Sequence, residues 1–311
     1  MRWTGKKVGL ALGGGGVRGF THIGVLKVLE REAIGIDLIV GTSAGALIGA
    51  AYASGQTPQG IQAKVDAYIH SPEFSASTLK SIGLSISPEQ KGRFRNIGSF
   101  LKTRYYTIRS FFRKGLLPKD DFQSLIDYFI PEIDISQTRI PFLAVTTDLI
   151  TGKQIVFSEG PLRQAVLASS AVPGAVEPVR QGQWLLTDGG VSSLVPVHAA
   201  RKAGADFVIA VMVDRGLTTA DAMGTAQDII SRAGEITANR LVEAELADAD
   251  VVIRPDVGDL HWMDFSHAGD LVRKGEAAAC MALGQINSSI PLYKRLARLV
   301  GRFLPGKKSR P

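Results

Sequence analysis

Ser43 is the side chain in this sequence best placed to act as a nucleophile. It lies in the stretch Gly-Thr-Ser-Ala-Gly, between Gly41 and Gly45, which follows an apolar run at 36–40 and precedes an alanine-rich stretch at 44–54. This G-x-S-x-G pattern between a strand and a helix is typical of a nucleophile elbow. The tight turn exposes the serine hydroxyl above a helix N-terminus, which favours developing negative charge. The pattern alone also occurs in ordinary turns, so other motifs must support it.

A glycine-rich loop provides the second motif. It follows an apolar run at 7–12 and consists of four successive glycines followed by Val-Arg-Gly, with Arg18 and Gly19 at its end. Consecutive glycines before a helix can turn several N–H groups toward one point, which suits a phosphate or an oxyanion. The spacing also fits a dinucleotide-binding loop, but that kind of site requires an acid at the tip of the second strand to bind the ribose. Asp37 stands at the start of that run and Ser43 follows its tip, so a nucleotide site is disfavoured.

The third motif is Asp188-Gly189-Gly190, which ends an apolar run at 184–187 and puts a carboxylate at a strand tip. In this order the three motifs resemble the patatin-like phospholipase family, and in particular its bacterial branch, which is similar to the catalytic domain of neuropathy target esterase. The resemblance extends from about residue 7 to 280 and includes the segments 168–179 and 194–206.

The resemblance implies a serine lipid acyl hydrolase of the phospholipase A or lysophospholipase type, working through an acyl-enzyme. Ser43 is then the nucleophile and Asp188 the general base. The amides of Gly14, Gly15 and Gly16, with Arg18 close by, form the oxyanion hole. The remaining motif positions are Gly19, Gly41, Gly45, Gly189 and Gly190. This chemistry needs no cofactor and no metal.

Alternatives remain both for the identity of the catalytic base and for the function of the protein. A conventional triad would use a histidine as base, and His22 and His198 are the candidates, although both positions are more typical of helix packing or of a surface. The activity could also be that of a general carboxylesterase on soluble esters. A non-catalytic membrane-binding scaffold is the third hypothesis, but all three motifs are intact.

The alternation of apolar runs predicts a three-layer α/β/α sandwich with a mixed, mostly parallel central sheet and the elbow at a strand tip. A hairpin turn is expected at 151–153. The expected strands are 7–12, 35–41, 140–147, 153–158, 183–188, 206–213 and 249–254. The expected helices are 18–33, 44–54, 58–70, 119–130, 161–169, 196–203, 222–247 and 267–286. We expect one acyl hydrolase domain over 1–288.

Composition and charge indicate where in the cell the protein is expected to work. The chain has 311 residues, 45% of them hydrophobic, and a net charge of +7. Its single cysteine, Cys280, excludes an internal disulfide. No apolar run is long enough to span a membrane, and the N-terminus lacks a secretory pattern. We therefore expect a cytoplasmic protein, with peripheral association with the inner face of the membrane.

Two basic segments suggest how such an association arises. A basic, aromatic lid or cap insertion is expected at 72–118. The overlapping stretch 80–119 holds ten Lys or Arg residues and one acid, interleaved with aromatic residues. A helix at 290–304, in a tail at 289–311, would place apolar residues on one face and basic residues on the other. Each segment either packs on the protein body or meets an anionic membrane that contains the phospholipid or lysophospholipid substrate. No nucleic-acid module is recognisable, and no nucleic-acid partner is expected.

Overall fold

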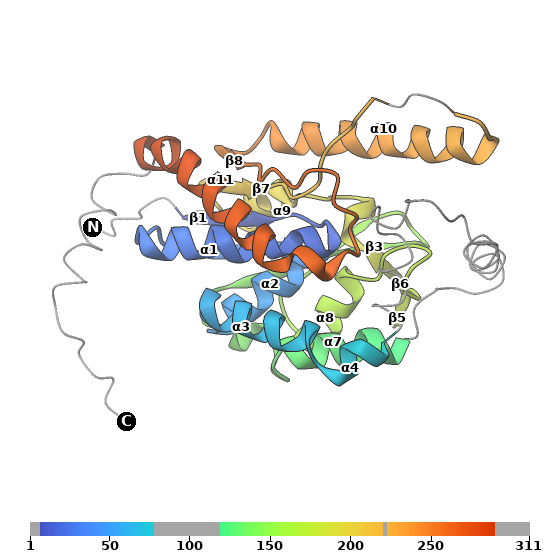
Figure 1. Cartoon of the computed structure of the whole chain (residues 1–311), viewed down its shortest axis with the longest axis horizontal. Coiled ribbons are helices and arrows are strands. Elements are labelled where there is room, and N and C mark those ends of the chain that lie inside the picture. The colour runs from blue at the N-terminus through green and yellow to red at the C-terminus, as the bar shows by residue number, and fades with distance from the viewer. Residues whose placement is uncertain (1–6, 78–118, 220–222, 290–311) are drawn as a thin grey trace.

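A single mixed sheet lies between two layers of helices in the computed structural model, which describes residues 7–77, 119–219 and 223–289 (Figure 1). In the described part of the chain the sheet has eight strands in the order β5-β6-β3-β2-β1-β7-β8, with β4 also paired to β3. The strands are β1 (Val8–Leu12), β2 (Leu38–Thr42), β3 (Phe142–Asp148), β4 (Gln154–Phe157), β5 (Val179–Gln181), β6 (Trp184–Asp188), β7 (Phe207–Val211) and β8 (Val251–Ile253).

The central strands run parallel and one side of the sheet is antiparallel. Strand β1 pairs in parallel with β2 and β7, β2 with β3, and β7 with β8. Strands β4 and β6 run antiparallel to β3, and β5 is antiparallel to β6. The mixed three-layer sandwich predicted from the sequence is therefore confirmed. The β3–β4 connection is the expected hairpin, with Gly152 at φ 70°, whereas β5 was not predicted.

The helices agree with the expected segments to within a few residues. They are α1 (Thr21–Arg31), α2 (Ala44–Ala53), α3 (Pro58–Ile69), α4 (Pro72–Ala76), α7 (Lys119–Phe129), α8 (Leu162–Ser169), α9 (Val197–Lys202), α10 (Ala226–Leu246) and α11 (Ala268–Ser289), with short 3₁₀ turns at Gly16–Phe20, Ile135–Gln137, Gly189–Val191 and Phe265–His267. Helix α4 was not predicted. The basic stretch from 78 onwards and the proposed helix at 290–304 lie outside the described residues.

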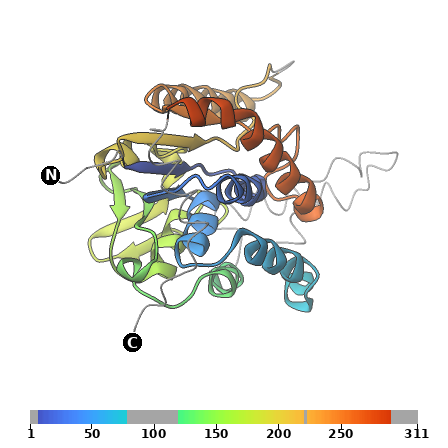
Figure 2. The same cartoon turned by 90° about the vertical axis from the view of Figure 1, so that its left-hand side faces the viewer.

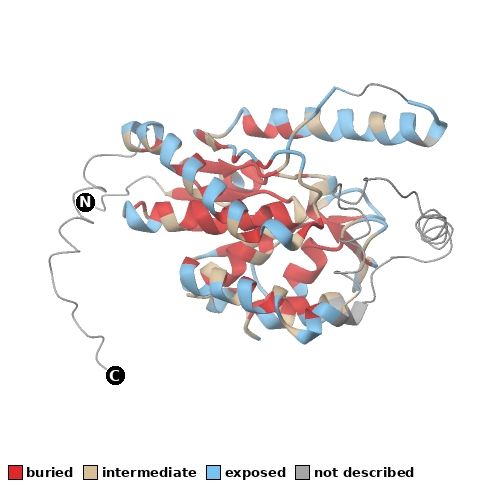
Figure 3. Cartoon of the chain, viewed as in Figure 1, coloured by how far each residue is buried: buried red, intermediate tan, exposed pale blue. Residues whose placement is uncertain are grey.

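The alternation of side chains along β1 divides the core in two. Leu10 and Leu12 pack into a large cluster with α1, α2, α3, α7, α8 and α11. Ala11, on the opposite face of the same strand, belongs to a smaller cluster with α9 and the end of α10. This is the period-two pattern of a strand covered on both faces, and the strands are accordingly buried throughout the centre (Figure 3).

The last two helices differ in how they meet the body. Helix α11 packs along α1, beside which it lies in both views (Figures 1 and 2). Helix α10 buries Val242 and Leu246 near its end but extends its first turns away from the sheet, with Ile229 and Ile230 exposed (Figure 3). No helix within the described ranges is both long and apolar enough to cross a membrane.

Candidate active site

Ser43 occupies a strained turn between β2 and α2. Strand β2 ends at Thr42 and α2 begins at Ala44, and Ser43 between them has φ 55° and ψ −123°. Such a conformation is unfavourable for any residue with a side chain, by about 1–3 kcal/mol, and persists only where the surroundings enforce it. Ser43 is 6% exposed. The geometry is that of the nucleophile elbow expected from the sequence.

The glycines that flank Ser43 allow α2 to pack directly against the sheet. A Cβ atom at Gly45 would lie 2.1 Å from the carbonyl oxygen of Leu12, and one at Gly41 would lie 2.5 Å from the Cα atom of Ala46. Both distances are far shorter than any real carbon contact, so no side chain fits at either position. The two glycines of the motif therefore serve the close approach of backbone to backbone around the serine.

Ser169, the last residue of α8, holds the turn in place. The Ser43 amide donates a hydrogen bond to the Ser169 Oγ (3.0 Å), and the Ser169 hydroxyl donates to the carbonyl oxygen of Val145 on β3 (2.6 Å). Ser169 is fully buried. The sequence analysis did not find this role, because no glycine pattern or periodicity marks a hydroxyl that bonds to a residue 126 positions away.

Asp188 ends β6 and is 5% exposed. Its Oδ1 accepts a hydrogen bond from the amide of Gly190 (2.7 Å). Burial raises the pKa of Asp188 to about 6, although hydrogen bonds from the Ser43 side chain and from the Gly190 amide oppose the rise. The structure thus brings the carboxylate and the Ser43 hydroxyl together, and the desolvation of the carboxylate outweighs the two hydrogen bonds.

The glycine loop presents fewer free amides than the sequence suggested. The amide of Gly14 already donates to the carbonyl oxygen of Leu194 (2.9 Å). No hydrogen bond is found for the amides of Gly15 and Gly16 within the described part of the chain. The loop follows β1 directly, so these two N–H groups are the ones available to an anion. The amide of Ala44, at the first position of α2, is a further candidate that the sequence analysis did not name.

Arg18, near the end of the glycine loop, has its positive charge paired within the protein. Its guanidinium forms an ion pair with Asp214 and donates from Nε to the carbonyl oxygen of Leu260 (3.0 Å). Burial lowers the pKa of Arg18, and the Asp214 charge opposes this. The arginine therefore joins the glycine loop to the segments after β7 and β8.

His22 is fully buried behind the glycine loop. One of its ring nitrogens, Nε2, is 2.8 Å from the carbonyl oxygen of Gly13, and burial lowers its pKa to about 4. A carbonyl oxygen can only accept, so Nε2 carries the proton and donates it. The ring is thus occupied in holding the loop and does not line the cavities beside Ser43.

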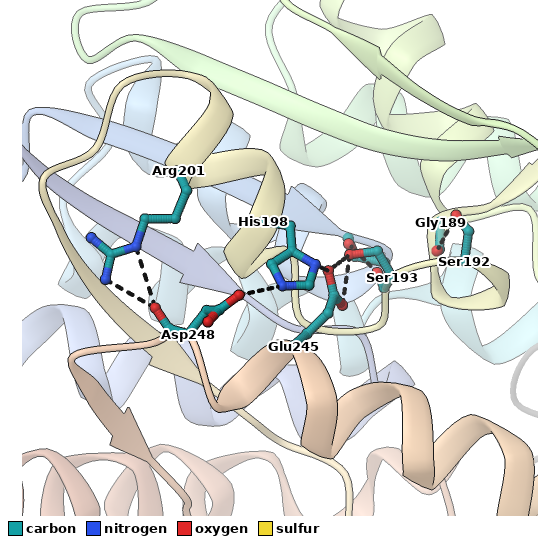
Figure 4. A network of polar contacts seen from close by, with 8 residues as sticks. Gly189, Ser192, Ser193, His198, Arg201, Glu245 and Asp248 are labelled. Atoms are coloured by element: carbon teal, nitrogen blue, oxygen red, sulfur yellow. Dashed lines mark hydrogen bonds and ion pairs between the residues drawn. The ribbon is translucent and has the colours of Figure 1, made fainter.

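His198 belongs to a polar network on the face of the sheet covered by α9 and the end of α10, opposite the face covered by α1 and α2 (Figure 4). Its Nε2 is 2.7 Å from Asp248 Oδ2, and its Nδ1 is 3.6 Å from Glu245 Oε1. Ser193 Oγ lies 2.7 and 2.9 Å from the two oxygens of the buried Glu245 carboxylate, and the Ser193 carbonyl oxygen accepts a hydrogen bond from Thr42 Oγ1 (3.0 Å). The network ties the elbow strand to the loop after Asp188 and to the end of α10.

Two cavities meet at Ser43. The first has a volume of about 560 Å³ and a mixed lining, in which the charged side chains of Arg18 and Asp188 stand beside apolar ones such as Leu194. The second has a volume of about 100 Å³ and is lined almost wholly by aliphatic and aromatic side chains of α2, α3, α7 and the segment around Phe265. In the described residues there is no group of three His, Cys, Asp or Glu side chains that could hold a metal ion. The arrangement places a carboxylate beside the Ser43 hydroxyl and an apolar cavity next to both.

Comparison with known proteins identifies the family of the chain. Residues 10–201 match the family model described as patatin-like phospholipase. The chain belongs to the patatin-like phospholipase family, a family of hydrolases.

Relatives in this family are longer than the chain. An uncharacterised NTE family protein of Mycobacterium tuberculosis is 30% identical over 248 residues, which are 80% of this chain and 59% of the relative. Patatin-like phospholipase domain-containing protein 6 of Mus musculus is 32% identical over 213 residues, 68% of this chain and 14% of that protein. Among solved structures, VipD from Legionella pneumophila aligns over 90% of this chain and 67% of its own, with 15% identity and a TM-score of 0.44.

Proposed function

We propose that this protein is a serine lipid acyl hydrolase of the phospholipase A or lysophospholipase type. The observation that carries the proposal is the position of Ser43 at the junction of two cavities, with the Asp188 carboxylate beside its hydroxyl. A hydroxyl needs an adjacent base to act as a nucleophile. An acyl chain is the substrate group that suits an apolar cavity next to the attacked carbonyl.

In the proposed acylation step the Ser43 oxygen attacks the ester carbonyl while its proton moves to Asp188. The negative charge that develops on the carbonyl oxygen is stabilised by amides of the glycine loop, with those of Gly15 and Gly16 as donors. Loss of one such donor typically reduces transition-state stabilisation by about 3 kcal/mol. Gly14 and Arg18 contribute by holding the loop, since their polar groups bond to Leu194 and Asp214. Asp188 then returns its proton to the departing alcohol.

Deacylation repeats the same proton transfers with water. Asp188 accepts a proton from a water molecule as it attacks the acyl-enzyme, and then protonates Ser43 as the fatty acid leaves. In this proposal the larger cavity, which contains the charged side chains, receives the leaving alcohol and its head group, and the apolar cavity receives the acyl chain. Each of the two side chains thus serves in both half-reactions.

A fluorophosphonate probe tests the nucleophile. The wild-type protein should be labelled covalently, and Ser43→Ala should not be labelled at all. Asp188→Asn should fold normally but label far more slowly. Equal labelling of Ser43→Ala and wild type would end the proposal. Full activity of Asp188→Asn would exclude Asp188 as the base.

The lipid substrate requires a separate test. Hydrolysis of defined phospholipids and lysophospholipids in vesicles, with the products identified by mass spectrometry, should release fatty acid at a higher rate than hydrolysis of short soluble esters. A preference for the soluble esters would favour the general carboxylesterase.

We further propose that the basic segments 80–119 and 290–310 bring the protein to an anionic membrane surface. In this scheme residues 1–288 form the acyl hydrolase domain, with an insertion at 72–118, and residues 289–311 form a cationic tail. The support is the distribution of charge in the sequence, because ten Lys or Arg residues stand against one acid in 80–119. Basic residues near an anionic surface contribute about 1 kcal/mol each.

A further inference from the structure

Two adjacent residues, Ser193 and Leu194, form backbone contacts with all three motifs of the candidate active site. The Ser193 carbonyl oxygen accepts a hydrogen bond from Thr42 Oγ1 (3.0 Å), at the end of the elbow strand. The Leu194 carbonyl oxygen accepts from the amide of Gly14 (2.9 Å), in the glycine loop. The Ser193 amide donates to the carbonyl oxygen of Gly189 (2.8 Å), in the Asp-Gly-Gly motif. The 193–194 segment therefore joins the three motifs at one point.

The side chain of Ser193 fixes this segment to the rest of the protein. Ser193 is fully buried, and its Oγ lies 2.7 and 2.9 Å from the two carboxyl oxygens of Glu245. Glu245 is itself only 2% exposed. A buried hydroxyl that loses its partner costs free energy, so this hydrogen bond strongly favours one position of the segment.

Glu245 comes from a part of the chain remote from the three motifs. It lies near the end of α10 (Figure 4) and outside residues 10–201, which match the family model. It lines neither of the two cavities that meet at Ser43. Any effect of Glu245 on the reaction must therefore pass through its contacts, and the hydrogen bond with Ser193 is the contact that leads to the site.

We propose that Glu245 is a positioning residue for the hydrolase reaction, acting through the Ser193 hydroxyl to hold the nucleophile, the base and the glycine loop in register. This inference rests on the proposed function of Ser43 and Asp188. Catalysis depends steeply on such geometry, since a misplacement of about 1 Å can reduce a rate about a hundredfold. Substrate binding depends on the cavity linings, to which Glu245 does not belong.

The test measures fluorophosphonate labelling and the hydrolysis of 4-nitrophenyl octanoate, at a temperature where every variant is folded. In Glu245→Ala the labelling rate and kcat should both fall by about tenfold or more while KM stays nearly unchanged. Glu245→Gln keeps an oxygen that accepts from Ser193 and should recover most of kcat. Glu245→Asp keeps the charge but withdraws the oxygens by one methylene group, and should remain slow. If Glu245→Ala does not fold, the comparison of the Gln and Asp variants decides the question.

Ser193→Ala examines the same hydrogen bond from its other side. It should slow labelling to a similar extent as Glu245→Ala. Combining the two substitutions should slow labelling no further than the slower single variant, because both remove one shared contact. Losses that multiply in the double variant would show that the two residues act independently, which overturns the proposal.

Leu246→Ala is the matched control, since Leu246 is the buried neighbour of Glu245 on α10 and has no polar group to bond the 193–194 segment. It should lower the melting temperature but leave kcat close to that of the wild type. An equal loss of kcat in Leu246→Ala and Glu245→Ala, or a wild-type kcat in Glu245→Ala, overturns the role of Glu245 while leaving the hydrolase intact. A wild-type protein that is neither labelled nor active overturns the proposed function itself.

Discussion

At the scale of single residues, the proposed mechanism makes the ionisation state of Asp188 decisive for the reactivity of Ser43. A carboxylate is ordinarily too weak a base at neutral pH, and a general base works best when its pKa lies near the working pH. Burial moves the pKa of Asp188 in that direction, to about 6, and the hydrogen bonds from Ser43 and Gly190 limit the rise. The carboxylate therefore remains ionised at pH 7 while gaining basicity.

The first prediction concerns the pH dependence of acylation. Since Asp188 must be ionised to accept the proton, kcat/KM should rise with pH through about 6 and level off above 7. The pKa of His22, lowered to about 4, lies too far away to produce this inflection. Initial rates on a soluble ester between pH 4.5 and 8 measure it. A rate that does not change across this range would contradict the assignment of Asp188 as base.

The second prediction is that Asp188→Asn makes the folded protein more stable at high pH. The folded state holds the Asp188 proton more tightly than the unfolded state, so ionisation of Asp188 removes stability as pH rises from about 4 to 6. A shift from 3.8 to about 6 corresponds to about 3 kcal/mol above that range. The variant should exceed wild type by up to this amount at pH 8 and by much less at pH 4.5.

Urea unfolding at the two pH values measures the difference in the free energy of unfolding. Asp66→Asn removes a carboxylate from an exposed position of α3 and is the control for the loss of a charge that is not buried. An Asp188→Asn gap that is equal at both pH values would show that burial of the charge is not the cause.

At the scale of elements, the elbow depends on three parts of the chain that meet behind it. Strand β2 and helix α2 supply the turn itself, and α8 supplies the Ser169 hydroxyl that bonds to the Ser43 amide. Ser169 is in turn anchored to β3. The strained φ of Ser43 is thus held by contacts from elements far apart in the sequence.

The third prediction tests that support with Ser169→Ala. The Ser43 amide and the Val145 carbonyl oxygen both lose their buried partner, and each unsatisfied group typically costs about 1–3 kcal/mol. We expect a lower melting temperature and fluorophosphonate labelling slowed by about tenfold or more, because the turn can relax away from Asp188. Ser54→Ala removes a hydroxyl bond to the Ala50 carbonyl at the opposite end of α2 and is the control. It should lose little labelling rate, and an equal loss in both variants would reduce Ser169 to a general stabilising contact.

These elements also show what the sequence could and could not predict. The central strands and the elbow were predictable because apolar periodicity and glycine spacing are local. Strand β5 was missed because its three residues, Val179–Gln181, have no apolar pattern and form a strand only by pairing with β6. The bond from Ser43 to Ser169 and the occupied amide of Gly14 arise from long-range packing. Such contacts leave no mark on the neighbouring sequence.

At the scale of the whole molecule, the charge is unevenly placed along the chain. The net charge of +7 arises from 36 basic and 29 acidic residues. The stretch 80–119 contributes ten of the basic residues and a single acid, and the tail from 290 contains basic residues without any acid. The proposed function requires access to an insoluble lipid, and under that proposal a cationic tail would concentrate the molecule at an anionic surface.

The fourth prediction is that this tail strengthens membrane binding in a salt-dependent way. In the 311-residue chain, the combined change of Arg295, Arg298 and Arg302 to Gln should weaken binding to vesicles containing phosphatidylserine by about tenfold or more at low salt. The combined change of Lys153, Arg180 and Lys202 to Gln is the matched control, because it removes the same charge from exposed positions of the catalytic domain. Co-sedimentation with vesicles at two salt concentrations measures both variants. If the two variants bind equally weakly, the net charge of the protein, and not the tail, sets its affinity for the membrane. If neither variant differs from wild type, attraction to anionic lipid does not depend on these residues.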